Sequence, residues 1–143
     1  MIYADTSVLA SLYMQDANTP RAVALVRSLT QPLFYCALHR LEIRNAFALA
    51  LFRGEQTQTQ ADAAWQNVEA DLKAQVLVPV PVQWSAALRR SAEIAWAETP
   101  TLGSRSADIL HVACAEQLRA IDFLSFDQRQ RALAARLGFS VQP

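Results

Sequence analysis

Short apolar runs alternate with longer amphipathic patterns of helical periodicity along almost all of this 143-residue chain. The runs that predict strands cover residues 2–4, 33–36, 76–81, 121–126 and 139–141. The patterns that predict helices cover residues 7–14, 22–29, 37–53, 56–75, 83–96, 106–119 and 128–137. Strands that alternate with helical crossovers form parallel sheets covered on both faces. We therefore expect an α/β fold with three α/β/α layers and a short, mostly parallel central sheet.

The chain contains no internal repeat and no linker rich in Gly or Ser, so we expect one domain over residues 1–143. Pro100 and Gly103 predict a loop over residues 99–105. The helix expected over 56–75 has few hydrophobic residues, which favours a projecting clip or lid over a central position.

Charge and composition exclude several classes of protein. A hydrophobic content of 52% is too high for disorder, and a formal net charge of zero argues against a module that coats DNA through a broad basic face. No apolar run approaches 18 residues, no basic stretch opens the chain, and two cysteines are too few for a disulfide-rich secreted fold. We expect a cytoplasmic protein without a membrane partner.

Four acidic residues lie in contexts where a surface charge is unexpected. Asp5 ends the first predicted strand, Asp127 follows the strand at 121–126, Asp108 opens a helix, and Glu42 lies inside an apolar helix. Because ligands of parallel α/β sheets bind at the carboxyl ends of the strands, we expect these acids to face one crevice. Carboxylates gathered in this way repel one another. A Mg²⁺ ion relieves that repulsion and can assist phosphoryl displacement by water.

Each acid also has a purely structural interpretation. Asp5 suits an Asx-turn, Asp127 suits a helix N-cap three residues before Gln130, and Asp108 suits the positive end of a helix dipole. Glu42 could be a solvated helix residue, although neither residue four positions away is basic. No one of these interpretations explains all four acids together.

The order and surroundings of the acids resemble the PIN domain, and the chain length and terminal motifs look like VapC-type toxins of bacterial toxin–antitoxin pairs. The resemblance implies a Mg²⁺- or Mn²⁺-dependent endoribonuclease that leaves a 5′-phosphate and a 3′-hydroxyl. It also implies a homodimer that is silenced by a cognate antitoxin lying in the active-site groove. The motifs that carry it are Asp5-Thr6-Ser7, Leu41-Glu42-Ile43, Ser106-Ala107-Asp108-Ile109-Leu110-His111-Val112-Ala113 and Phe123-Leu124-Ser125-Phe126-Asp127.

By this resemblance Asp5, Glu42, Asp108 and Asp127 form the catalytic and metal-binding site. Ser125 stands where the family often has Thr, and either hydroxyl can hold a water molecule or an acid.

Other polar residues near the four acids are candidates for supporting roles. Thr6 and Ser7 either orient a metal-bound water or cap the next helix. Asn45 lies on the same helix face as Glu42, where it could hold a ligand or simply be a surface amide. Arg105, in a predicted loop, is a candidate to bind an RNA phosphate, whereas Arg44 faces away from Glu42 on an ideal helix.

Two pairs of Cys and His have the spacing of zinc ligands. Cys36 and His39 are three residues apart, as are His111 and Cys114. Their apolar surroundings favour packed side chains over a zinc site.

The tryptophans and several other large apolar side chains are expected in a core or an interface. Helical spacing with Val and Leu favours packing over base stacking for Trp65, Trp84 and Trp96. Met1, Met14, Phe47 and Phe52 are assigned to the same kind of environment.

Two other functions are compatible with the acidic residues. One is a different metal-dependent phosphohydrolase, acting on DNA or small phosphoesters. The other is a non-catalytic PIN-like module that binds RNA or an antitoxin.

Overall fold

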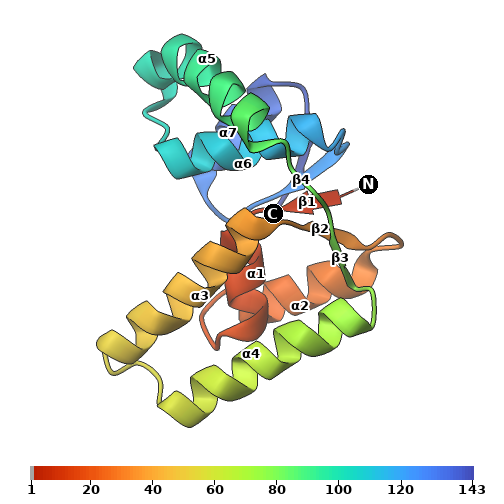
Figure 1. The fold of residues 1–143 in the computed structure, drawn as a ribbon, viewed down its shortest axis with the longest axis vertical. Helices are drawn as coiled ribbons and strands as arrows, with labels where there is room; N and C mark the ends of the chain where they lie inside the picture. The colour runs from red at the N-terminus through yellow and green to blue at the C-terminus, as the bar shows by residue number, and fades with distance from the viewer. Residues whose placement is uncertain (1) are drawn as a thin grey trace.

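The computed structural model describes residues 2–143, and within that range five strands form one entirely parallel sheet (Figure 1). The order of the strands across the sheet is β3-β2-β1-β4-β5. This arrangement confirms the predicted α/β class. The strands are β1 (Ile2–Ala4), β2 (Leu33–Tyr35), β3 (Leu77–Pro79), β4 (Asp122–Leu124) and β5 (Ser140–Gln142).

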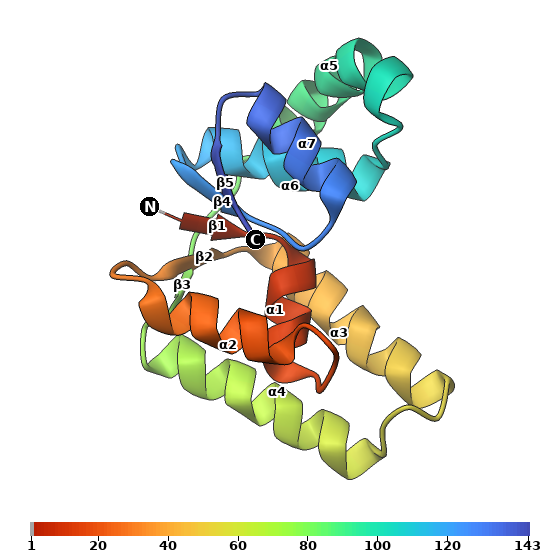
Figure 2. The same ribbon diagram turned by 180° about the vertical axis from the view of Figure 1, so that it is seen from behind.

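Helices cover both faces of the sheet, as the alternating pattern predicted (Figures 1 and 2). One layer contains α1 (Thr6–Tyr13), α2 (Thr19–Ser28), α3 (Ala37–Phe52) and α4 (Gln58–Lys73). The opposite layer contains α5 (Trp84–Leu102), α6 (Ser106–Gln117) and α7 (Gln128–Arg136).

The central strand β1 supplies both hydrophobic cores. Successive side chains of a strand point to opposite faces, so Ile2 and Ala4 pack with the layer of α1–α4 while Tyr3 packs with α5–α7. Tyr3 is fully buried, and its ring stacks on Phe123 of β4 at a centroid distance of 5.6 Å. A strand buried on both faces reads as a continuous apolar run, which explains why so short a segment was recognisable.

The register of β1 and β4 determines where the polar residues emerge. Ala4 lies opposite Leu124, and the ladder continues through a bond from the Asp5 N–H to the Leu124 carbonyl. Asp5 and Ser125 therefore leave neighbouring strands at the same edge of the sheet.

The loop predicted over residues 99–105 is shorter than expected: it covers residues 103–105, because α5 continues to Leu102. The helix passes through Pro100 and ends at Gly103, whose φ of 62° and N–H bond to the Thr99 carbonyl terminate it. An ion pair of 2.6 Å between Glu98 and Arg136 links the last turns of α5 to α7. The C-terminal part of α5 is therefore held by a tertiary contact that local sequence patterns do not reveal.

Helix α4 does not project as a clip or lid, because it packs against α1, α3 and β3. Val68 and Trp65 are buried on its inner face, as predicted for Trp65. Trp84 and Trp96 are exposed, and an interface role for them remains a prediction. None of the helices within residues 2–143 is long and apolar enough to span a membrane.

The other side chains assigned to a core or an interface have different environments. Phe47 is buried and Met14 is packed against the core, whereas Phe52 is exposed. Met1 lies outside the described residues.

Candidate active site

Asp5 is the N-cap of α1 and is held by three donors at the end of β1. Its Oδ1 accepts bonds from the Ser7 hydroxyl at 2.6 Å and the Val8 N–H at 3.2 Å. Its Oδ2 accepts a bond from the Ser125 hydroxyl at 2.7 Å. The side chain is almost fully buried, and two of the three predicted supporting hydroxyls, those of Ser7 and Ser125, donate to it.

Burial is the main influence on the protonation of Asp5. Loss of solvent raises the pKa of this carboxyl above its ordinary value, although the bonds from Ser7 and Ser125 oppose the rise. A carboxylate kept in this environment is costly in the absence of a cation. The environment therefore favours binding of positive charge.

Glu42, on α3, is fixed by donors from two other helices. Its Oε2 accepts bonds from the Thr6 hydroxyl and from Nε2 of His111, each at 2.5 Å. The other ring nitrogen of His111, Nδ1, lies 2.8 Å from the Tyr3 hydroxyl. The hydrogen-bonded chain Tyr3–His111–Glu42, in which Tyr3 and His111 are buried, therefore joins β1, α6 and α3.

The hydrogen bonds and charge of the groups that donate to Glu42 lower the pKa of its carboxyl by more than partial burial raises it. Burial alone would raise the pKa of the carboxyl, but the hydrogen bond and charge of His111 and the bond from Thr6 lower it below its ordinary value. Glu42 is therefore held as a carboxylate. Among residues 2–143 it is the one acid of the four that accepts a hydrogen bond from a basic side chain, and that side chain comes from a different helix.

Asp108 and Asp127 each accept bonds at a helix N-terminus. Asp108 lies in the first turn of α6, where its Oδ2 accepts the Arg105 N–H at 3.2 Å. Asp127 is the N-cap of α7, and its Oδ1 accepts the N–H groups of Arg129 and Gln130 at 2.8 and 3.1 Å. Asp108 and Asp127 therefore lie at helix N-termini, as their structural interpretations expected. Asp5 is likewise the N-cap of α1.

Gln130 and Ser125 connect these helix ends. The Gln130 amide donates to the Asp108 carbonyl at 3.3 Å, and the Ser125 hydroxyl lies 3.4 Å from the amide oxygen of Gln130. The Asp127 N–H donates to the same Ser125 hydroxyl at 3.0 Å. Thr6 follows Asp5 in the sequence, and His111 lies one turn after Asp108, so these bonds, with those that Asp5 and Glu42 accept, connect the segments that carry the four acids. The bonds that join Ser125 to Asp127 and Gln130 to Asp108 involve backbone groups of the two acids.

The carboxyl groups of the described residues do not by themselves form a complete set of metal ligands. Among residues 2–143, no three His, Cys, Asp or Glu side chains are grouped so that they could hold a metal ion. Within the described chain, Oε1 of Glu42, Oδ1 of Asp108 and Oδ2 of Asp127 accept no hydrogen bond. Hard carboxylate oxygens suit Mg²⁺, which commonly takes one or two of them and keeps several waters. The donor set therefore fits a hydrated divalent cation.

Two of the other predicted residues lie at the surface. Asn45 is exposed on α3, and within the described chain its side chain makes no hydrogen bond. Arg105 is exposed as the residue preceding α6, directly beside Asp108. The position of Arg105 is compatible with a phosphate contact, whereas Asn45 has no visible link to Glu42.

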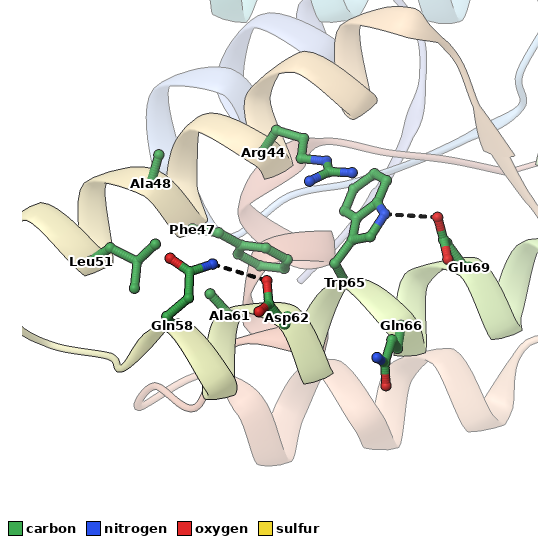
Figure 3. A pocket seen from close by; sticks show the side chains of 10 residues that line it. All are labelled: Arg44, Phe47, Ala48, Leu51, Gln58, Ala61, Asp62, Trp65, Gln66 and Glu69. Atoms are coloured by element: carbon green, nitrogen blue, oxygen red, sulfur yellow. Dashed lines mark hydrogen bonds between the residues drawn. The ribbon is translucent and has the colours of Figure 1, made fainter.

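Arg44 points away from the acids, as the helix geometry predicted. Its guanidinium lies 3.6 Å from the centre of the Trp65 ring, in a hollow of about 450 Å³ between α3 and α4 (Figure 3). The same hollow contains the bond from the Trp65 indole to Glu69 and that from Gln58 to Asp62. None of the four candidate acids lines it.

A second hollow of about 450 Å³ is mainly apolar and is lined by Glu42 alone among the four acids. It lies between α3, α5 and α6, and the exposed Leu41 and Leu88 form part of its wall. Any segment bound there would lie beside the candidate active site.

The Cys and His residues with zinc spacing are packed and hydrogen-bonded. His39 accepts the Cys36 N–H on Nδ1 and lies 2.8 Å from the Ala4 carbonyl through Nε2, so both of its nitrogens are occupied. Both nitrogens of His111 are occupied as well. Cys36 and Cys114 are free and buried, and the hydrogen bond with Cys36, followed by burial, raises the pKa of Cys114. These contacts support the packed interpretation.

Sequence reasoning did not identify the roles of Tyr3, His111 and Gln130. A buried polar side chain needs a partner, so a His among Leu110, Val112 and Ala113 indicates that one exists. It does not indicate that the partner is Glu42, 69 residues away.

Comparison with known proteins identifies the family. The sequence profile of the PIN domain matches residues 2–136, so the chain belongs to the PIN domain family. Comparison with curated proteins finds no significant match.

Solved structures share the fold over the whole chain. FitAcB from Neisseria gonorrhoeae is 22% identical, with a TM-score of 0.70, over 100% of this chain and 97% of that one. VapC20 of Mycobacterium tuberculosis, described as a toxin that cleaves the sarcin–ricin loop, is 19% identical, with a TM-score of 0.71, over 100% of both chains. FitAB bound to an IR36 DNA fragment is 22% identical, with a TM-score of 0.68, over 99% of this chain and 94% of that one.

Proposed function

We propose that this protein is a divalent-metal-dependent endoribonuclease that acts as the toxin of a toxin–antitoxin pair. The observation that supports the proposal is a series of hydrogen bonds, through Ser125, Gln130, Thr6 and His111, that links the segments carrying Asp5, Glu42, Asp108 and Asp127. Membership of the PIN family and a fold shared with a toxin that cleaves the sarcin–ricin loop support it.

The four acids would hold Mg²⁺ or Mn²⁺ through their free oxygens and bridging waters. Such an ion supplies positive charge that lowers the pKa of bound water and stabilises charge developing on a phosphate. Thr6 and Ser7 hold the carboxylates of Glu42 and Asp5 in place, and Ser125 links Asp5 to Asp127.

The residues of the chain have distinct tasks in the proposed cleavage. Arg105, exposed beside Asp108, binds a phosphate of the RNA through its guanidinium. Water adds to the scissile phosphorus while the bond to the 3′ oxygen breaks. The products then carry a 5′-phosphate and a 3′-hydroxyl. One proton of the water goes to the leaving 3′ oxygen, and the other stays on the new phosphate group until that group ionises into solvent.

The same proposal includes two protein partners. A cognate antitoxin would silence the enzyme by placing a segment in the apolar hollow beside Glu42. A second copy of the chain would cover exposed apolar side chains such as Leu88 on α5 and Leu41 on α3. Either partner would remove these side chains from water.

The substrate class is tested by incubating the purified protein and Mn²⁺ with total RNA, with single- and double-stranded DNA and with a small phosphoester. The proposal expects cleavage of RNA alone, with mapped 5′-phosphate ends. Preferential hydrolysis of DNA or the small ester would favour the other phosphohydrolase. RNA binding without cleavage would favour the non-catalytic module.

A further inference from the structure

His111 is the side chain at the site whose role neither the acids nor the fold explains. It is 3% exposed and lies on α6, one turn after Asp108, with the buried residues Val112 and Ala113 beside it. Placing an imidazole in such surroundings costs free energy unless both ring nitrogens find partners. Both do, through Tyr3 on one side and Glu42 on the other.

The two contacts determine which nitrogen carries a proton. The phenol of Tyr3 can donate to Nδ1, which leaves the proton of a neutral ring on Nε2, facing Glu42. A charged ring also carries a proton on Nε2. The remaining tautomer would place the Nε2 lone pair 2.5 Å from a carboxylate oxygen, where two acceptors repel. In either allowed state His111 therefore donates to Glu42.

The Thr6 hydroxyl donates to the same oxygen of Glu42, Oε2, as His111 does. With two donors on Oε2, the carboxylate cannot rotate without losing a bond, and Oε1 accepts no hydrogen bond from the described residues. One oxygen is thus used for orientation while the other remains available.

We infer that His111, held by Tyr3, is a positioning residue that orients Glu42 so that its free oxygen can bind the divalent cation. The inference rests on the proposed function, because it assigns Glu42 to the metal. Removing a hydrogen-bond partner of a metal ligand typically lowers metal affinity 10- to 100-fold. We expect a loss of that size when the donor at position 111 is removed.

The test is Mn²⁺ titration of the full-length protein by calorimetry and electron paramagnetic resonance. The variants are His111→Leu, which removes the donor, and His111→Gln, whose amide can still donate to Glu42. His39→Gln is the matched control, because His39 is equally buried but bonds to the Ala4 carbonyl. We expect a 10- to 100-fold loss for His111→Leu, recovery to within a few-fold for His111→Gln, and no comparable loss for the control.

A double-mutant cycle with Glu42→Gln separates positioning from a general effect on the fold. If His111 acts through Glu42, His111→Leu causes little further loss of Mn²⁺ affinity in the Glu42→Gln background. An equal loss in both backgrounds, or wild-type affinity in a folded His111→Leu variant, overturns the inference.

Nitrogen NMR of the His111 ring gives a readout that does not need the leucine variant to fold. In the wild-type protein the Nε2 signal should be that of a protonated nitrogen, and a neutral ring protonated on Nδ1 alone overturns the inference. Failure of the proposed function looks different: the wild-type protein would bind Mn²⁺ in a His111-dependent manner yet cut no RNA. RNA cleavage and Mn²⁺ affinity that are insensitive to His111→Leu would contradict this inference alone.

Discussion

The Ser125 hydroxyl donates a hydrogen bond of 2.7 Å to Oδ2 of Asp5, although 120 residues separate the two in the sequence. The contact joins the carboxyl ends of the neighbouring strands β1 and β4. Because the Asp127 N–H donates to the same hydroxyl, one small side chain fixes two of the four acids. Ser125 is fully buried, so no solvent can replace it.

Replacement of Ser125 by Ala should therefore destabilise the protein. A buried hydrogen bond to a charged group contributes about 1.5–3 kcal/mol, so we expect a loss of about 2 kcal/mol in the free energy of unfolding. Urea unfolding measures it, with the exposed Ser85→Ala as the control. A Ser125→Ala variant as stable as Ser85→Ala would show that the hydroxyl does not hold Asp5.

Asp5→Asn should raise thermal stability at neutral pH when no divalent cation is present. Burial raises the pKa of Asp5 in the folded state, so ionisation costs stability above that pKa. The amide removes this cost, and each kcal/mol relieved corresponds to roughly 4 °C in Tm for a domain of this size.

Calorimetric scans across pH test the sign of this effect. The advantage of Asp5→Asn should be complete above the folded pKa of Asp5 and disappear as the pH falls through it, because the wild-type carboxyl then becomes neutral. Added Mn²⁺ should raise the Tm of the wild type more than that of the variant. An advantage that persists unchanged at low pH, or an equal Mn²⁺ effect on both proteins, would argue against this assignment.

Arg105→Ala should weaken RNA binding and slow cleavage without changing the fold. The guanidinium is exposed beside Asp108, and its loss removes one phosphate contact. We expect a several-fold rise in the Kd for RNA with a weaker dependence on salt, measured by fluorescence anisotropy with Asp5→Asn as the background. Arg53→Ala is the control, because Arg53 is also exposed but lies at the C-terminal end of α3, far along that helix from Glu42. Equal behaviour of the two variants would exclude Arg105 as a phosphate-binding residue.

Leu88→Asp should shift the proposed homodimer toward monomers. The side chain is 57% exposed on α5 and borders the apolar hollow, so a charge there would be buried in any interface that covers it. Light scattering after size exclusion measures the mass, with Arg89→Asp as a charge-changing neighbour for comparison. A wild-type protein that is monomeric at all concentrations, or a dimer indifferent to Leu88→Asp, would contradict this arrangement.

The fold and the position of Asp5 at the end of a strand were predictable because they depend on patterns local to each element. An apolar triplet such as residues 2–4 is distinctive, and the carboxyl end of a parallel strand is a recognisable position for Asp5. The boundary of α5 was not predictable, because Pro100 is tolerated in a last turn that Glu98 links to Arg136.

The partners of each acid were harder to predict than the acids themselves. The pairing of His111 with Glu42 depends on how α6 packs beside α3, which no spacing in the sequence encodes. Asn45 shows the converse: it shares a helix with Glu42 but lies exposed, as the surface-amide interpretation expected, since a shared face does not ensure contact.

The proposed metal-dependent cleavage is tested most directly by incubating RNA with the wild-type protein and with Asp5→Asn, each with Mn²⁺ and with a chelator. We expect only the wild type with Mn²⁺ to cut RNA, leaving 5′-phosphates, while Asp5→Asn remains folded and inactive. Equal cleavage by the two proteins, or cleavage that survives the chelator, would contradict the proposal.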